Sequence, residues 1–332
     1  MARKKSAIKK VYSSAIPHIY AFLGRTALPY YPSKISIESG NLCNLRCPLC
    51  PTGQQDKSAK KGFISFDVFK KVVDEIGQYL TVIRLYNWGE PTLNKDFLRM
   101  THYAKERGID IKISTNLSMK MEDDQIEAFV KAGLEKIYIS CNGASSESYL
   151  KYHVGGDFDL VMDNMKRLVR KKREIPGCHT NLIWLFHVFK HNEHEIDAAK
   201  ELAKKIGIKI KISKMRPDMG KEVFETTQRA LERDLAWIPD NPEFTVVSTK
   251  QKKRIGCMLP WTETMINWDG SVLPCCAVYS EKYAFGNILD NSFEQIWNNE
   301  MYIAARKEIL GMKNDKNTIC HICKNSGYLH GG

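Results

Sequence analysis

Short runs rich in β-branched and aromatic residues alternate with helix-length amphipathic stretches over residues 35–215. The runs have the composition of strands, and the stretches between them place apolar residues at the spacing of one helix face. Several stretches begin near Asp or Asn and end at Gly, as helices do. The pattern predicts strands over 35–39, 81–88, 109–116, 136–142, 181–189 and 208–215. It predicts helices over stretches that include 66–80, 95–108, 122–133 and 193–207.

Strands separated by helices form right-handed βαβ units, so this order of elements predicts a parallel sheet. The six units are too few for a closed eight-stranded barrel, and we expect an open, partial barrel or a doubly wound sheet. The charged residues 216–255, which include Pro239 and Pro242, predict a linker. Beyond them, residues 256–332 combine Gly, Pro, Trp and five cysteines, which predicts a small loop-rich module. Residues 1–34 form a basic extension ahead of the barrel.

The composition favours a folded cytoplasmic protein. Hydrophobic residues make up 43% of the chain, enough for a normal buried core. Apolar stretches are far shorter than the ~20 residues that span a bilayer, and the amino terminus lacks the apolar run of a signal peptide. In a reducing cytosol, the ten cysteines indicate metal binding rather than disulfides.

The formal charge of +12 is compatible with nucleic acid, a membrane surface or an anionic substrate as partner. We favour a solvated basic surface, and we expect no nucleic-acid partner because no RNP-type motif or zinc-finger histidine pair accompanies the charge. The amino-terminal segment is compatible with a helix on an anionic membrane, but we favour a helix packed against the barrel. Its cations are Arg3, Lys4, Lys5, Lys9 and Lys10, and the apolar residues Ile16, Ile19, Tyr20, Phe22 and Leu23 follow.

Three cysteines follow the first predicted strand in the segment 43–50 (Cys-Asn-Leu-Arg-Cys-Pro-Leu-Cys). Three thiolates within eight residues can surround one metal centre and leave a coordination position open for a substrate or cofactor. Zinc is the alternative, but it usually takes a fourth protein ligand at short spacing, and the next His or Cys is His102. We therefore favour an iron–sulfur cluster in this loop.

This cysteine loop and its position after the first strand resemble the radical S-adenosylmethionine (SAM) superfamily. Members of that family share an α/β fold with a partial (βα)6 TIM barrel. The resemblance implies that Cys43, Cys47 and Cys50 ligate a [4Fe–4S] cluster and that SAM chelates its fourth iron. Leu49 stands at a position that is often aromatic in the family.

Further motifs of the family fall at the ends of the next predicted strands. The segment 87–91 (Asn-Trp-Gly-Glu-Pro) is similar to the GGEP motif, which binds the amino group of SAM, although Glu90 can instead brace its loop. The carboxyl ends of parallel strands meet at one face, where such folds build active sites. The resemblance implies SAM contacts from Gly89, Glu90, Ser114, Asn116, Ser140, Asn142 and Lys151, with His153 in the same region as Lys151.

A second set of cysteines, Cys257, Cys275, Cys320 and Cys323, lies in the predicted module. The segment 267–270 (Asn-Trp-Asp-Gly) is a type I′-like hairpin signal that would return Cys257 to Cys275. We favour a cluster over zinc, because zinc sites with four cysteines usually use two CxxC pairs and one is present here. The set resembles the SPASM/twitch domain of radical SAM enzymes, with spacing similar to aminocyclitol dehydrogenase-type twitch enzymes. The resemblance implies one auxiliary cluster, and hence two [4Fe–4S] clusters in all.

The family resemblance implies an enzyme in which an electron from a flavodoxin- or ferredoxin-type donor cleaves SAM, and a 5′-deoxyadenosyl radical then takes hydrogen from the substrate. We expect oxidation of a small polar metabolite, such as a sugar or aminocyclitol, with the auxiliary cluster as electron acceptor. Arg216 is a candidate for orienting the base that removes the hydroxyl proton. Cys276, the thiol left beside Cys275, would make the enzyme an epimerase if it returned hydrogen to the substrate.

Two further interpretations stay open. A SPASM-type peptide-modifying maturase is the alternative enzyme, although we expect no separate peptide-binding domain before the barrel. A zinc-stabilised RNA-binding protein is the alternative from another class, and the iron content of purified protein would distinguish it.

Overall fold

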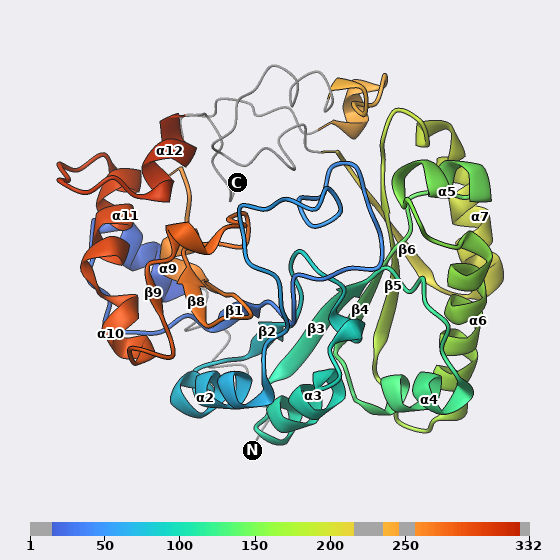
Figure 1. Cartoon of the computed structure of the whole chain (residues 1–332), viewed down its shortest axis with the longest axis horizontal. Helices are drawn as coiled ribbons and strands as arrows, with labels where there is room; N and C mark the ends of the chain where they lie inside the picture. The colour runs from blue at the N-terminus through green and yellow to red at the C-terminus, as the bar shows by residue number, and fades with distance from the viewer. Residues whose placement is uncertain (1–14, 216–234, 246–255, 326–332) are drawn as a thin grey trace.

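The computed structural model describes residues 15–215, 235–245 and 256–325. Within these residues, nine strands form one sheet in the order β6-β5-β4-β3-β2-β1-β7-β8-β9 (Figure 1). The first six run parallel in chain order, which confirms the predicted partial barrel. They are β1 (Lys34–Ile37), β2 (Val82–Arg84), β3 (Asp110–Thr115), β4 (Lys136–Ser140), β5 (Asn181–His187) and β6 (Lys209–Ser213).

Helices cover the outer side of the curved sheet, as Figure 1 shows for α2, α3, α4, α6 and α7. Burial alternates along the strands because successive side chains point to opposite sides. In β3, Ile111 and Ile113 are buried against the helices, whereas Lys112 and Ser114 are half-buried on the inner side. The helices are α2 (Phe66–Ile76), α3 (Phe97–Glu106), α4 (Asp123–Lys131), α5 (Ser146–Tyr152), α6 (Phe158–Glu174) and α7 (Ile196–Ile206). Short 3-10 turns are η1 (Pro91–Leu93), η2 (Glu193–Glu195), η3 (Pro242–Phe244) and η4 (Glu281–Tyr283).

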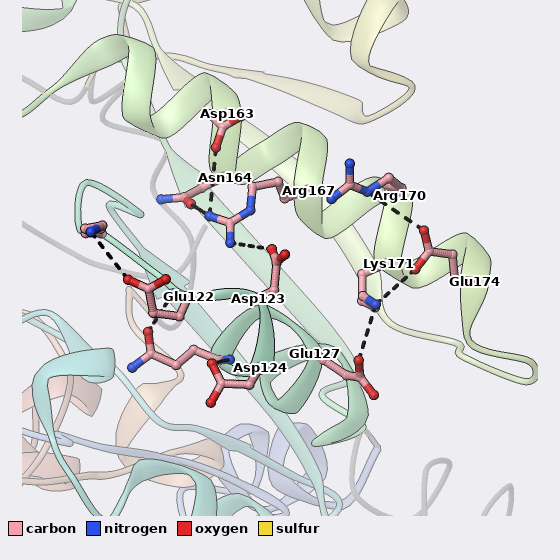
Figure 2. Close-up of polar contacts among 12 residues, drawn as sticks. Glu122, Asp123, Asp124, Glu127, Asp163, Asn164, Arg167, Arg170, Lys171 and Glu174 are labelled. Atoms are coloured by element: carbon pink, nitrogen blue, oxygen red, sulfur yellow. Dashed lines mark hydrogen bonds and ion pairs between the residues drawn. The ribbon is translucent and has the colours of Figure 1, made fainter.

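Polar side chains join the outer helices α4 and α6 at the surface. Arg167 on α6 lies 2.7 Å from Asp123 on α4, and Lys171 lies 3.2 Å from Glu127 one turn further on (Figure 2). Because these ion pairs are partly exposed to solvent, they contribute little to the stability of the fold compared with the buried apolar core.

The carboxyl-terminal module continues the barrel sheet. β7 (Met265–Ile266) pairs in parallel with β1, and β8 (Ser271–Leu273) and β9 (Gly286–Asn287) follow in antiparallel order. Its helices are α9 (Leu259–Thr262), α10 (Phe293–Trp297), α11 (Glu300–Leu310) and α12 (Ile319–Asn325). One sheet contains strands from both sides of residue 256. The division of the chain into barrel, linker and module therefore stays a prediction.

The hairpin between β7 and β8 differs from the predicted type I′ turn. That turn needs positive φ at Trp268 and Asp269, and neither is among the described non-glycine residues with positive φ. Gly270 supplies the left-handed position at φ +84°, and its N–H donates to Asn267 O at 3.0 Å. The loop is therefore a type I turn followed by a glycine bulge, which also reverses the chain.

The segment ahead of β1 bonds to the module and, through Ser33 O and Thr81 N–H at 2.8 Å, to the barrel, so the expected packing of its helix against the barrel stays a prediction. Residues 15–22 are helical. Trp261 Nε1 donates to Arg25 O at 3.0 Å, and Leu28 N–H donates to Asn298 Oδ1 at 2.9 Å. These bonds fix the entry into β1.

The cations at positions 3–10 lie outside the described residues. Ile19, Phe22 and Leu23 are exposed, so contact of this segment with a membrane surface stays a prediction. In the described part of the chain, no helix combines the length and apolar character needed to cross a bilayer.

Candidate iron–sulfur and cofactor site

The loop after β1, residues 38–62, carries the first cysteine set and folds against neighbouring strand-end loops. Glu90 N–H, after β2, donates to Leu42 O at 2.9 Å. Asn44 Nδ2 donates to Ser118 O, after β3, at 2.7 Å. The carboxyl ends of β1, β2 and β3 therefore meet at the cysteine loop, as the parallel order predicts.

Cys47 lies beside the segment that follows α5. Arg46 N–H donates to Val154 O at 2.9 Å, and His153 Nδ1 lies 3.7 Å from Cys47 Sγ. The other ring nitrogen of His153 accepts Asn142 N–H at 3.1 Å. Burial lowers the pKa of His153 to about 3, so its imidazole is neutral at pH 7. The family resemblance puts His153 in the same region as Lys151, a predicted SAM contact, and the structure places its ring against Cys47.

The first three thiols form one electrostatic group. Burial, and then the charges of Glu90 and Cys50, raise the pKa of Cys43 to about 11, against the lowering effect of Leu45 N–H. Burial and the two other cysteines hold the pKa of Cys47 well above its usual value. Such thiols fit an iron–sulfur cluster, because bound iron supplies the positive charge that lets them ligate as thiolates.

Neither cysteine set is a compact single-ion site. In the ranges that the structure describes, no three His, Cys, Asp or Glu side chains converge closely enough to hold one metal ion. A cluster places each thiolate on a different iron atom, so its ligands are spaced more widely than those of tetrahedral zinc.

The loop after β2 fits tightly against the cysteine loop. A Cβ on Gly89 would lie 1.9 Å from Gly40 O, which leaves no room for a side chain. Trp88 N–H and Gly89 N–H donate to the Glu38 carboxylate at 2.8 and 3.3 Å. Burial raises the pKa of Glu38 to about 7, and these N–H groups oppose the rise. Sequence reasoning missed Glu38, whose single signal is a carboxylate near the end of an apolar strand run.

Trp88, which replaces a glycine of the family motif, packs against the module. Its ring meets Tyr279 edge to face, with centroids 5.7 Å apart. Lys61, from the cysteine loop, donates to the Tyr279 hydroxyl, and Cys50 Sγ lies 3.8 Å from Trp88 O. This contact joins the cysteine loop, the loop after β2 and the module.

Two of the predicted SAM contacts brace loops. The Glu90 carboxylate accepts Asn116 N–H at 2.7 Å and Thr92 N–H at 3.2 Å. Asn116 Nδ2 donates to Asn44 Oδ1 at 2.9 Å and lies 3.6 Å from Cys43 Sγ. These bonds agree with the bracing alternative for Glu90, and a SAM contact from either residue stays a prediction.

The remaining predicted SAM contacts lie at different depths. Ser114 and Ser140 are half-buried on the inner side of β3 and β4. Asn142 is buried, and its Oδ1 accepts a backbone N–H at the end of β5 at 2.9 Å. Lys151 is exposed on α5. Arg216 lies outside the described residues.

The structure brings the second cysteine set together. Burial, and then Cys276, Cys320 and Cys257, raise the pKa of Cys275 well above its usual value. Burial and then Cys257 and Cys323 do the same for Cys320. Cys320 and Cys323 also lie three residues apart on α12, a spacing that puts both on one face. The segment before α9, the segment after β8 and helix α12 thus carry the four predicted ligands.

Cys276 lies between the second cysteine set and the inner side of the barrel. Its side chain is exposed, and its carbonyl accepts Asn87 Nδ2 at 3.0 Å. The hydrogen bond to Glu263 raises the pKa of Arg84 and burial raises the pKa of Tyr86 to about 12, and the Cys276 thiol adds a smaller rise to each. Arg84 in turn forms a two-pronged pair with Glu263 at 2.5 and 2.8 Å.

Comparison with known proteins supplies relatives over most of the chain. The chain is 24% identical to the tungsten-containing aldehyde ferredoxin oxidoreductase cofactor-modifying protein of Pyrococcus furiosus, over 80% of this chain and 81% of that protein. It is 24% identical to the AdoMet-dependent heme synthase of Methanosarcina barkeri, over 82% and 84%. It is 23% identical to the mycofactocin maturase MftC of Mycobacterium ulcerans, over 77% and 72%.

Solved structures share the fold. BtrN in complex with AdoMet and 2-DOIA superposes with a TM-score of 0.51 at 16% identity, over 85% of this chain and 88% of that chain. SuiB of Streptococcus suis bound to the precursor peptide SuiA has a TM-score of 0.58 at 14% identity, over 88% and 71%. The Radical SAM superfamily profile matches residues 37–203, and the SPASM iron–sulfur cluster-binding domain matches residues 257–324. The chain therefore belongs to the radical SAM superfamily, whose members bind SAM at a [4Fe–4S] cluster, and it carries a carboxyl-terminal SPASM domain.

Proposed function

We propose that this chain is a radical SAM oxidoreductase that oxidises a small polar metabolite and passes the released electron to an auxiliary cluster in the module. One observation carries the proposal: Cys276, next to a predicted module ligand, bonds through its carbonyl to Asn87 at the mouth of the barrel. This bond joins the module to the loop after β2, which also contacts the cysteine loop. A substrate at this junction would have the cofactor on one side and the module on the other.

The first cysteine set would hold the catalytic cluster through Cys43, Cys47 and Cys50. When bound, SAM at the reduced cluster supplies a 5′-deoxyadenosyl radical that removes hydrogen from a C–H bond. The tight contact between Gly89 and Gly40 fixes the loop after β2, whose carbonyls would face the cofactor. The polar partners that we propose for SAM are Gly89, Glu90, Ser114, Asn116, Ser140, Asn142 and Lys151.

The inner face of the sheet is basic, which bears on the substrate. Arg84, Lys112 and Lys136 are direct neighbours across β2, β3 and β4, and like charges in that position are unfavourable without nearby anions. Arg84 pairs with Glu263, and Lys112 lies 3.5 Å from Glu135. Lys136 adds a further positive charge to this row. The charge favours a neutral or anionic sugar over a cationic aminocyclitol.

The proposed oxidation of a C–OH group to C=O removes one hydrogen atom, one proton and one electron. The bound cofactor would accept the hydrogen atom, a side-chain base the proton and the auxiliary cluster the electron. His187 is a candidate base because its half-buried side chain ends the inner side of β5, and burial and then Lys211 lower its pKa to about 4, so it is neutral and free to accept a proton. Arg216 stays a candidate for orienting the base. The auxiliary cluster would be held by Cys257, Cys275, Cys320 and Cys323.

Two alternative reactions have specific support. The exposed Cys276 thiol, within reach of the inner face, favours an epimerase in which this thiol returns a hydrogen atom to the substrate. A peptide substrate is favoured by the likeness to MftC, named a maturase, and to SuiB, which was crystallised with its precursor peptide.

Substrate-dependent turnover tests these proposals. Reduced enzyme and SAM are incubated with a panel of sugars, sugar acids, aminocyclitols and short peptides, and 5′-deoxyadenosine and product masses are measured. We expect a product two mass units lighter, from a neutral or anionic sugar, and Cys276→Ser should still form it. A product of unchanged mass in ordinary water that gains deuterium in deuterated water would establish the epimerase, provided that Cys276→Ser no longer forms this product. Turnover of peptides alone would contradict a metabolite substrate.

A further inference from the structure

We propose that His153 is a positioning residue that sets the reduction potential of the first cluster through a hydrogen bond to Cys47. The inference rests on the proposed function only through the assignment of Cys47 as a cluster ligand. The His153 ring is buried, with 2% of its surface exposed. It stacks on Tyr149 with centroids 4.6 Å apart and meets Tyr152 edge to face at 5.2 Å. These contacts hold the imidazole in one orientation.

The hydrogen bonds of the ring identify its tautomer. Asn142 N–H donates to Nε2 at 3.1 Å, and because a backbone N–H can only donate, Nε2 carries no proton. A neutral imidazole with a bare Nε2 holds its proton on Nδ1. Nδ1 lies 3.7 Å from Cys47 Sγ, so it donates an N–H···S bond to the sulfur.

A donor at a cluster sulfur has a defined electronic effect. Hydrogen bonds to the ligating sulfurs stabilise the additional negative charge of the reduced cluster and thereby raise its potential. Cys43 accepts from Leu45 N–H at 3.4 Å and from Asn116 Nδ2 at 3.6 Å, and the backbone N–H groups of Gly53 and Thr52 act on Cys50. His153 is thus the side chain that brings this effect to Cys47.

The two bonds of the ring can be separated by substitution. His153→Asn places an amide N–H near the position of Nδ1 and keeps a donor toward Cys47. His153→Gln instead places its amide near Nε2, where it can accept Asn142 N–H, and removes the donor. His153→Phe removes both bonds but keeps an aromatic ring over Tyr149. His191→Gln is the control, because that imidazole contacts Ser148 O at 3.2 Å.

The test is a redox titration of the full-length protein with both clusters, followed by EPR. The cluster whose signal changes when SAM is added is the first cluster. We expect His153→Gln and His153→Phe to shift its midpoint potential to more negative values, while His153→Asn and His191→Gln stay near wild type and the second cluster is unmoved. Iron content checks that each variant keeps its clusters.

Three results would overturn the assignment. Wild-type potentials in both the Gln and Phe variants would mean that the bond to Cys47 has no electronic effect. Loss of the first cluster from all three His153 variants would show that the residue only supports the structure of the cysteine loop. A protein in which neither cluster responds to SAM would contradict the proposed function itself, and with it the role of Cys47.

Discussion

The barrel and the module share one sheet, but they are stabilised in different ways. The barrel strands are three to seven residues long and bury alternate apolar side chains, such as Ile113 and Trp184, against the helices. Strands β7, β8 and β9 have only two or three residues, and the largest buried side chains beside them are Trp261, Trp297 and Arg306. A periodic apolar pattern therefore suffices for the barrel, whereas the module depends on particular side chains and, we propose, on its metal.

Arg306 illustrates this dependence. Its guanidinium is fully buried and lies 4.6 Å from the centre of the Trp297 ring. Burial lowers its pKa to about 10, so it is still charged at pH 7. It donates to three carbonyls: Pro260 O at 2.9 Å, Trp297 O at 3.0 Å and Thr26 O at 2.8 Å. One side chain thus connects α9, α10 and the segment ahead of β1.

The largest effect is expected from removing metal ligands of the module. Cys320→Ala with Cys323→Ala should unfold α12 and the neighbouring loops, because binding free energy at structural metal sites, on the order of 10 kcal/mol for zinc, is folding free energy. Hydrogen exchange should report lost protection in residues 256–325 and retained protection in β2–β5. Equal loss in both regions would contradict the separate stabilisation of the module, and full protection of the module would show that it needs no metal.

Arg306→Met should destabilise the protein by about 3–5 kcal/mol, because it leaves buried carbonyls without their charged donor. Denaturant unfolding measures the change. Arg170→Met is the control: Arg170 is mostly exposed and lies 3.8 Å from Glu174, so it should change stability by less than about 0.5 kcal/mol. Similar changes in the free energy of unfolding for the two variants would show that Arg306 stabilises the protein no more than an exposed arginine does.

Gly89→Ala should cost about 1–3 kcal/mol, since its Cβ would overlap the backbone at Gly40. It should also weaken SAM binding, measured by isothermal titration to the reconstituted protein. Gly133→Ala is the matched control: a Cβ there meets no atom closer than 3.7 Å, and φ is +69°. That variant should lose about 1 kcal/mol from backbone strain and bind SAM normally. Normal SAM binding by both variants would show that Gly89 does not shape the cofactor site.

The smallest effect is expected at the exposed ion pairs of the barrel in Figure 2. Arg167→Met removes the pair with Asp123, which should lower stability only slightly, and less still in high salt. Thermal unfolding at low and high ionic strength provides the measurement. A salt-independent loss comparable to that of Arg306→Met would mean that polar contacts stabilise both regions alike.

The barrel was predictable because each strand is a local apolar run and each helix has its own amphipathic pattern. The prediction failed where a non-local contact takes over. The strand predicted over 81–88 ends at Arg84, and beyond it Trp88 and Gly89 donate their N–H groups to the Glu38 carboxylate. Such a competition cannot be seen in a local window of sequence.

In the candidate site, too, residues marked by a local pattern could be predicted, whereas residues that act through non-local contacts could not. The seven cysteines of the two sets were chosen as candidate ligands from their spacing and from the family resemblance, and their ligation of iron stays a prediction. Glu38 and His153 were not assigned their roles, because they contact residues 50 and 106 positions away. Arg306 was likewise missed, since a buried arginine has no distinguishing pattern among fifty Lys and Arg residues.

The most direct test of the account compares the two cysteine sets in one preparation. Cys43→Ala, Cys47→Ala and Cys50→Ala are combined, reconstituted with iron and sulfide, and assayed for iron and for 5′-deoxyadenosine. Cys178→Ala, outside both sets, is the control. We expect about eight irons in wild type and control, about four in the triple variant, and no SAM cleavage in that variant although its module stays folded. SAM cleavage by the triple variant would contradict the assignment of the first set as the catalytic centre.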